Sequence, residues 1–190
     1  MLEQLEQYAK ENNVPIMQSD GIDYLCDYIK EHSIKRILEI GTAIGYSAIR
    51  MSLVDPEIQI VTIEKDLERY KIAIQNIQEM NLKNRIQVIY GDALETAVEG
   101  EFELVFIDAS KGHNIDFFNR YSPYLTQDGT IITDNLSFHG LVEDESLAVT
   151  KNQRGIVKKI KNFITFLDEN DDFVTEYVSV GDKISISRRK

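Results

Sequence analysis

Hydrophobic and polar positions alternate along this 190-residue chain with two different periods. Apolar residues recur every three or four positions in residues 2–12 and 20–31, which predicts two helices, the second capped by Ser19 or Asp20. Five short apolar runs follow, at residues 36–40, 59–63, 86–90, 104–107 and 130–133. Helical stretches lie between them and begin directly after the first run, at Asp66 and near Asp116. This order predicts right-handed β-α-β crossovers and a parallel sheet with helices on both faces.

The last part of the chain follows a different pattern. Apolar residues between 156 and 167 mark a long helix, and residues 173–180 and 183–188 read as two strands. Gly181 and Asp182 between them are typical of a two-residue hairpin. We therefore expect one α/β domain over residues 1–190, with a seven-stranded, mostly parallel sheet whose last strand is antiparallel. Ligands of such sheets bind beyond the carboxyl ends of the strands.

The first predicted strand runs into the sequence EIGTAIG, residues 39–45. Gly41 and Gly45 allow a sharp turn and a close approach of a ligand to the backbone. The spacing is not the GxGxxG of dinucleotide-binding folds, because position 43 is Ala, and an acidic Glu39 precedes it. An ExGxxxG pattern is typical of S-adenosylmethionine-dependent methyltransferases, although a glycine turn without any ligand is the simpler alternative. Glu64, which ends the second strand, is placed to accept hydrogen bonds from a ribose diol.

Two neighbouring strands end in oxygen donors. Asp108 closes the fourth run, Asp134 and Asn135 close the fifth, and Lys111 follows Asp108 by three residues. Hard oxygen ligands favour Mg²⁺, with Mn²⁺ and Ca²⁺ as alternatives. Such an ion would lower the pKa of a coordinated hydroxyl, and Lys111 could accept its proton. Each residue also has an ordinary structural explanation, as a helix cap, a turn or a solvated lysine.

Taken together, EIGTAIGYS, Glu64, the GDA of residues 91–93, DASK and DN resemble the cation-dependent O-methyltransferase family, which includes catechol and caffeoyl-CoA O-methyltransferases. The resemblance covers nearly the whole chain and implies a class I methyltransferase, Rossmann-like fold. It implies metal ligation by Asp108, Asp134 and Asn135, and Lys111 as general base. For S-adenosylmethionine it implies a set of contacting residues: Met17, Gly41, Ser47, Glu64, Asp92, Ala93 and Asp108. It also implies a homodimer.

Composition limits the partners and the cellular compartment that can be expected. The formal net charge of −11 disfavours nonspecific nucleic-acid binding but leaves room for a local basic patch. The single Cys26 excludes an internal disulfide and fits a reducing cytoplasm, and no apolar run is long enough to span a membrane.

The acceptor is the least determined part of the prediction. Chelation requires two adjacent oxygens, which catechols and 5-hydroxyuridine both have. The chain is similar to short bacterial family members that methylate tRNA wobble 5-hydroxyuridine to 5-methoxyuridine. It contains no Trp, so the aromatic gate of the catechol enzymes has no obvious equivalent, and the loop 136–150 is its own. A small phenolic acceptor remains the alternative, and a nucleoside-binding module without catalysis is a third.

A basic stripe supports the tRNA hypothesis. Residues 151–161 contain five basic side chains and no acidic one. At helical spacing, four of them fall opposite the apolar positions and are candidate contacts to the tRNA anticodon: Lys151, Arg154, Lys158 and Lys161. A solvated face of an amphipathic helix explains the same pattern. His113 and His139 are uncertain neighbours of the site.

Overall fold

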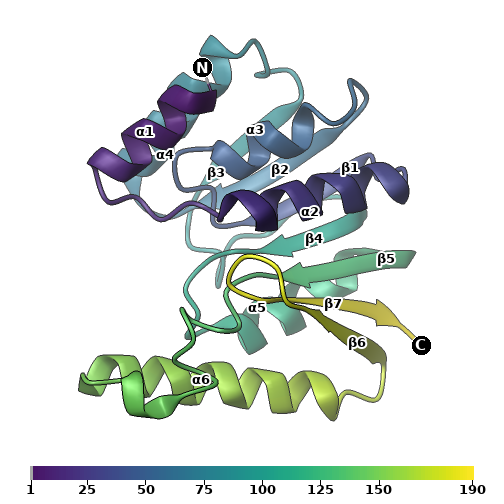
Figure 1. Ribbon diagram of the computed structural model, residues 1–190. Coiled ribbons are helices and arrows are strands. Elements are labelled where there is room, and N and C mark those ends of the chain that lie inside the picture. Colours follow the sequence, from purple (N-terminus) through teal and green to yellow (C-terminus); the bar gives the residue numbers. More distant parts are fainter. Residues whose placement is uncertain (1) are drawn as a thin grey trace.

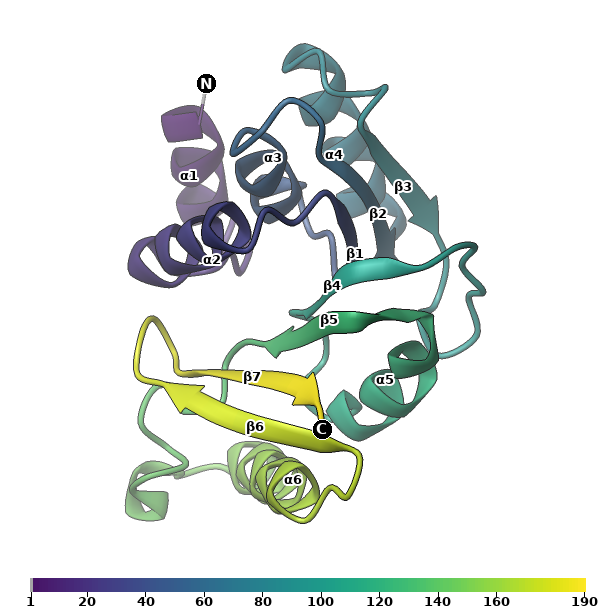
Figure 2. The same ribbon diagram turned by 90° about the vertical axis from the view of Figure 1, so that its right-hand side faces the viewer.

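A computed structural model describes residues 2–190 as a three-layer α/β fold (Figure 1). The strands are β1 (Arg36–Ile40), β2 (Gln59–Glu64), β3 (Ile86–Tyr90), β4 (Phe102–Ile107), β5 (Leu125–Thr133), β6 (Phe173–Val178) and β7 (Ile184–Arg189). They form one sheet in the order β3-β2-β1-β4-β5-β7-β6, visible in Figure 2. β1 to β5 pair in parallel, whereas β7 is antiparallel to both of its neighbours. The predicted fold class is thus confirmed.

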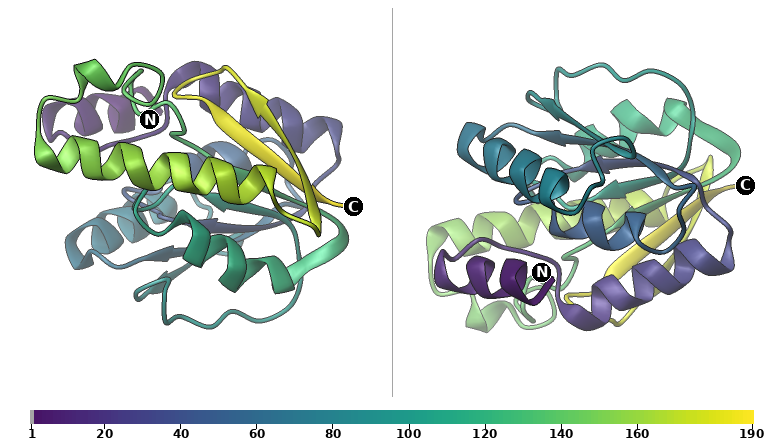
Figure 3. Two further views of the ribbon diagram at one scale, coloured as in Figure 1. Left: turned by 90° about the horizontal axis from the view of Figure 1, so that it is seen from below. Right: turned by 90° about the horizontal axis from the view of Figure 1, so that it is seen from above.

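Helices cover both faces of the sheet (Figure 3). α1 (Leu2–Glu11), α2 (Ser19–Glu31), α3 (Tyr46–Ser52) and α4 (Leu67–Glu79) lie on one face, and α5 (Asn114–Tyr121) and α6 (Lys151–Asp168) on the other. Short 3₁₀ turns occupy Ser122–Tyr124 and Glu145–Leu147. No helix among residues 2–190 has the length and apolar character needed to cross a membrane.

The core follows the period of two expected of strands buried on both faces. In β4, Leu104 and Phe106 pack with the α1–α3 side, while Val105 and Ile107 pack with α5 and α6. On the second side, Phe118 of α5 makes edge-on contacts with rings of α6 and β6, including Phe173 at 5.0 Å between ring centroids. This packing fixes α6 beside the loops that follow β4 and β5.

Two local predictions were wrong. Helix α2 begins at Ser19 after Gln18, and neither Ser19 nor Asp20 caps it. The Asp20 carboxylate instead accepts hydrogen bonds from its neighbour Gly21 N (3.0 Å) and from Gly181 N (3.1 Å), far along the chain. The Asp20 side chain is therefore engaged in holding the β6–β7 loop rather than the helix terminus.

The β6–β7 connection is also longer than the predicted two residues, since β6 ends at Val178 and β7 begins at Ile184. Asp182 within it is 5 % exposed and accepts a hydrogen bond from His139 N at 2.6 Å. Backbone amides of Leu136 and Ser137 donate to Lys183 O and Asp182 O, both at 2.9 Å. Because these residues of the β6–β7 connection bond to the loop after β5, the two strands end earlier than in a tight hairpin.

Candidate active site

The register of the sheet brings the carboxyl ends of the central strands to one edge. Ile40 of β1 pairs with Ile63 of β2 and with Ile107 of β4, and Ile107 pairs with Thr133 of β5. The residues that follow these strands are therefore neighbours in space. This is the juxtaposition that the sequence predicts for Gly41, Glu64, Asp108 and Asp134.

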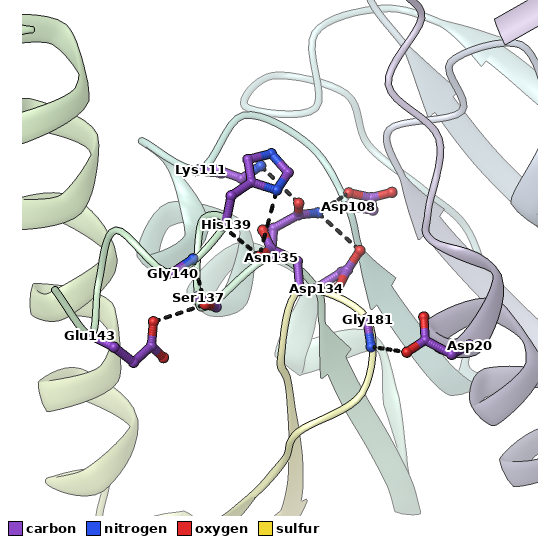
Figure 4. A network of polar contacts seen from close by, with 11 residues as sticks. Asp20, Asp108, Lys111, Asp134, Asn135, Ser137, His139, Gly140, Glu143 and Gly181 are labelled. Atoms are coloured by element: carbon purple, nitrogen blue, oxygen red, sulfur yellow. Dashed lines mark hydrogen bonds and ion pairs between the residues drawn. The ribbon is translucent and has the colours of Figure 1, made fainter. Parts of the chain in front are cut away.

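Asp108, Asp134 and Asn135 form a contiguous polar cluster (Figure 4). Asn135 Nδ2 donates to Asp108 Oδ1 and to Asp134 Oδ2, at 2.9 Å each. The backbone of Asn135 has a φ of +66°, a left-handed conformation that asparagine tolerates better than most residues. This conformation directs the amide between the two carboxylates.

Asp134 is buried and Asp108 is partly buried at the cavity wall, and loss of solvation is the main reason that their pKa values are raised. The pKa of Asp108 lies well above its usual range, with the nearby Asp134 and Glu39 adding to the effect of burial. The pKa of Asp134 rises to about 6, mainly through burial, although a backbone hydrogen bond opposes the shift. Asp134 Oδ1 is buried without a hydrogen-bond partner. Two adjacent carboxyls with raised pKa values, one of them with an unpartnered oxygen, fit a divalent cation, which would favour their charged forms.

Few side chains are available to bind a metal ion at this cluster. Among residues 2–190, no three His, Cys, Asp or Glu side chains come together as a metal-binding group. A site here depends on two carboxylates and the Asn135 amide, with waters and acceptor oxygens completing the coordination shell. Asn135 presents its nitrogen to the carboxylates, whereas a metal ligand would present Oδ1.

Lys111 lies at the same cluster. Its Nζ donates to Asn135 Oδ1 at 2.9 Å and lies 5.2 Å from the centroid of the Phe138 ring. The lysine is partly buried, and its amine contacts an amide oxygen rather than a carboxylate. It is thus placed to exchange a proton with a hydroxyl bound beside Asn135.

The glycine loop is held by Glu64. Gly41, Ala43 and Gly45 all have positive φ angles, of +101°, +46° and +85°. Glu64 Oε2 accepts a hydrogen bond from Ala43 N and Oε1 accepts one from Asp66 N, both at 2.8 Å. Glu64 therefore stabilises the loop conformation in addition to the ribose contact predicted for it.

Glu39 is fully buried beneath this loop. It accepts hydrogen bonds from Ser47 Oγ and Thr62 Oγ1, both at 2.5 Å, and burial raises its pKa to about 7. Ser47, predicted to contact the methionine end of the cofactor, donates its hydroxyl to Glu39 and is 7 % exposed.

A cavity of about 330 Å³ connects the glycine loop with the acidic cluster. Most of the predicted cofactor residues line it: Gly41, Glu64, Asp92, Ala93 and Asp108. Lys111 and Asn135 line its other end. A cofactor bound by the first group would thus lie against the second.

The whole chain, residues 1–190, matches the model of the O-methyltransferase family. The chain belongs to this family. A Staphylococcus aureus structure described as a candidate caffeoyl-CoA O-methyltransferase superposes with a TM-score of 0.95 at 33% identity, covering 100% of this chain and 92% of that one. An O-methyltransferase from Bacillus cereus, solved with S-adenosylhomocysteine, gives a TM-score of 0.83 at 26% identity, covering 100% and 90%. A catechol O-methyltransferase of Mycobacterium tuberculosis is 32% identical over 65% of this chain, but the match spans only 58% of that relative.

The protein is therefore a class I S-adenosylmethionine-dependent O-methyltransferase of the caffeoyl-CoA and catechol type. The O-methyltransferase cavity has walls that sequence reasoning missed: Pro15, Ile16, Lys65, Arg69, Ser110 and Phe117. Met17 was the predicted residue of the first loop, but its side chain is 5 % exposed and packs near Gly21, outside the cavity wall. Nothing in the spacing of residues 13–18 distinguishes Ile16 from Met17, because the loop has no periodicity.

The predicted RNA-contacting residues are all exposed, but they differ in their partners. Arg154 donates to Ala148 O and Val149 O at 3.0 Å each, and Lys161 pairs with Glu145. These two residues of the O-methyltransferase thus hold the loop before α6. His139 is exposed and His113 pairs with Asp116, so neither histidine lines the cavity.

Proposed function

We propose that this O-methyltransferase transfers a methyl group from S-adenosylmethionine to the 5-hydroxyl of 5-hydroxyuridine at the tRNA wobble position, giving 5-methoxyuridine, with Mg²⁺ held by Asp108, Asp134 and Asn135. The observation that carries the proposal is the contact between Lys111, Asn135 and both carboxylates at the end of the cofactor cavity. When bound, Mg²⁺ supplies acidification and orientation of the acceptor hydroxyl. The paired 4-carbonyl and 5-hydroxyl oxygens of this base suit such chelation.

Lys111 acts as the general base in this proposal. Lys111 Nζ now donates to Asn135 Oδ1. If Asn135 turned this oxygen toward the cation, the Lys111 amine would lose that acceptor and be free to contact the acceptor hydroxyl. Phe138 lies beside Lys111 and supplies an aromatic wall for the acceptor ring, in a chain that has no Trp.

Two experiments test the proposal. Mass spectrometry of tRNA nucleosides should show loss of 5-methoxyuridine and accumulation of 5-hydroxyuridine when the gene is deleted; unchanged 5-methoxyuridine would exclude the tRNA role. With purified protein, Lys111→Ala should lower methyl transfer by about 10²- to 10⁴-fold while S-adenosylhomocysteine still binds. Lys83→Ala, an exposed lysine just before β3, is the matched control.

A small catechol-like acceptor is the second candidate, favoured by the similarity to the Mycobacterium tuberculosis enzyme. Methylation of catechol with no transfer to 5-hydroxyuridine would select it. In either case, chelation by EDTA should abolish transfer and added Mg²⁺ should restore it. We further propose that the protein is cytoplasmic and forms a homodimer. Sedimentation of the purified protein would test the dimer.

A further inference from the structure

A second cavity, of about 910 Å³, opens beside the first. The two share Ala109, Ser110 and Lys111, so the second cavity begins where the acceptor hydroxyl would meet the cofactor. Its remaining walls are Gly112, Phe138 and one side of the first turns of α6. We call this cavity the α6 groove.

The α6 groove is basic. Lys111, Lys151 and Lys159 line it, and no acidic residue does. Within residues 2–190, no carboxylate lies within ion-pair distance of Lys151 or Lys159, in contrast to Lys161 with its Glu145 partner. A Cβ placed on Gly112 would lie 2.9 Å from Lys159 Nζ, so that amine sits over the residue next to Lys111. In a protein of net charge −11, this groove concentrates uncompensated positive charge at the acceptor side.

The groove takes in only part of the basic stripe. Lys151, Gly155 and Lys159 recur every four residues along α6 and line the groove. Lys158 lies about 100° around the helix axis from Lys159 and about 20° beyond Lys151, past the edge of the groove, which it does not line. A Cβ on Gly155 would meet no atom within 4 Å, so the wall between the two lysines is open to a ligand.

We infer that the α6 groove is a phosphate subsite, in which Lys159 and Lys151 bind the backbone phosphate of the acceptor nucleotide while Phe138 flanks its base. This inference rests on the proposed nucleotide acceptor and extends it to residues outside the acidic cluster. Ammonium groups of lysine bind phosphate as point charges, and aromatic rings stack on bases of single strands. A free catechol carries no group that would use these lysines.

Binding of a fluorescein-labelled uridine pentaribonucleotide, followed by anisotropy at several salt concentrations, tests the inference without requiring methyl transfer. Lys159→Glu should weaken binding about tenfold, and Lys159→Gln by less, because charge reversal adds repulsion to the lost contact. The slope of log Kd against log salt should fall by about 0.7 for the lost phosphate contact. Lys83→Glu carries the same charge change near the amino end of β3 and should bind like the wild type.

Equal affinities and salt slopes for Lys159→Glu and Lys83→Glu would overturn the phosphate subsite. S-adenosylhomocysteine affinity of each variant verifies that it is folded. A kinetic comparison separates this inference from the proposed function. The preference for an oligonucleotide containing 5-hydroxyuridine over the free nucleoside should fall about tenfold in Lys159→Glu through KM. Absence of any transfer to 5-hydroxyuridine would refute the proposed acceptor, while the binding comparison would still decide the role of Lys159.

Discussion

Gly41 couples the cofactor loop to the first metal-ligand candidate, which makes Gly41→Ala a sharp test of the site. A Cβ at this position would lie 2.4 Å from Asp108 O and 2.9 Å from Asp108 C, both backbone atoms. The φ of +101° is itself unfavourable for an L-residue. Alanine therefore cannot be accommodated unless the backbone of Asp108 moves.

The magnitude follows from comparison with Gly45, in the same loop. Gly45 has a φ of +85°, but its Cβ would meet Ala73 atoms only at 3.5 Å or more, which is ordinary contact. Gly45→Ala should thus cost only the conformational term, about 1–2 kcal/mol. Gly41→Ala should cost about 1–3 kcal/mol more, as overpacking adds to the same term.

Urea unfolding of the two variants measures this difference, and calorimetry with S-adenosylhomocysteine measures its effect on the site. Since displacement of Asp108 distorts the cavity wall, Gly41→Ala should lose about tenfold or more in affinity, and more than Gly45→Ala. Equal destabilisation by the two substitutions would refute the argument that the loop is packed against Asp108.

Two further predictions concern Glu39 and α6. Burial raises the pKa of Glu39 from 4.5 to about 7. The folded protein therefore holds the Glu39 proton more tightly than the unfolded chain does. The contribution of Glu39 to the unfolding free energy is highest below pH 4.5 and falls as the pH rises to 7. Relative to the wild type, Glu39→Gln should therefore gain up to about 3 kcal/mol of unfolding free energy between pH 5 and pH 8 in urea titrations; a difference that does not vary with pH would contradict the assigned shift. Gly155→Ala should raise the unfolding free energy by up to about 1 kcal/mol, because glycine is unfavourable inside a helix and the new methyl group meets no atom within 4 Å. A loss of stability in urea would show that position 155 is not open.

The cofactor half of the site was predictable because it depends on local rules. Apolar runs locate strands, polar residues at their ends locate the ligand edge, and parallel pairing brings those ends together. Gly41, Glu64 and Asp108 follow from that reasoning, and Asp66 caps α4 by accepting from Glu68 N and Arg69 N as its position predicts. Ile16 and Arg69 were missed because their approach to the cavity depends on how loops and helices pack over the sheet.

The loop after β5 was not predictable for a physical reason. Asp182, Asp20 and the backbone of residues 136–139 hold one another through hydrogen bonds between segments more than 40 residues apart. Such bonds leave no periodic signal in any of the three segments. The same sequence, GD between two strands, would form a tight hairpin if no partner loop lay beside it.

The acceptor side depends on a further quantity that sequence pattern does not contain, the rotation of α6 about its axis. The apolar positions define which side of the helix is buried, with Ile160 and Phe163 in the core. They leave two exposed flanks, and both carry lysines or arginine. Packing of α6 against α5 turns Lys151, Gly155 and Lys159 toward the α6 groove, while Arg154 and Lys161 engage the loop 145–149. If the α6 groove binds the acceptor phosphate, substitutions at Lys151 and Lys159 should change the choice of acceptor, whereas substitutions at Arg154 and Lys161 should change the stability of the loop 145–149.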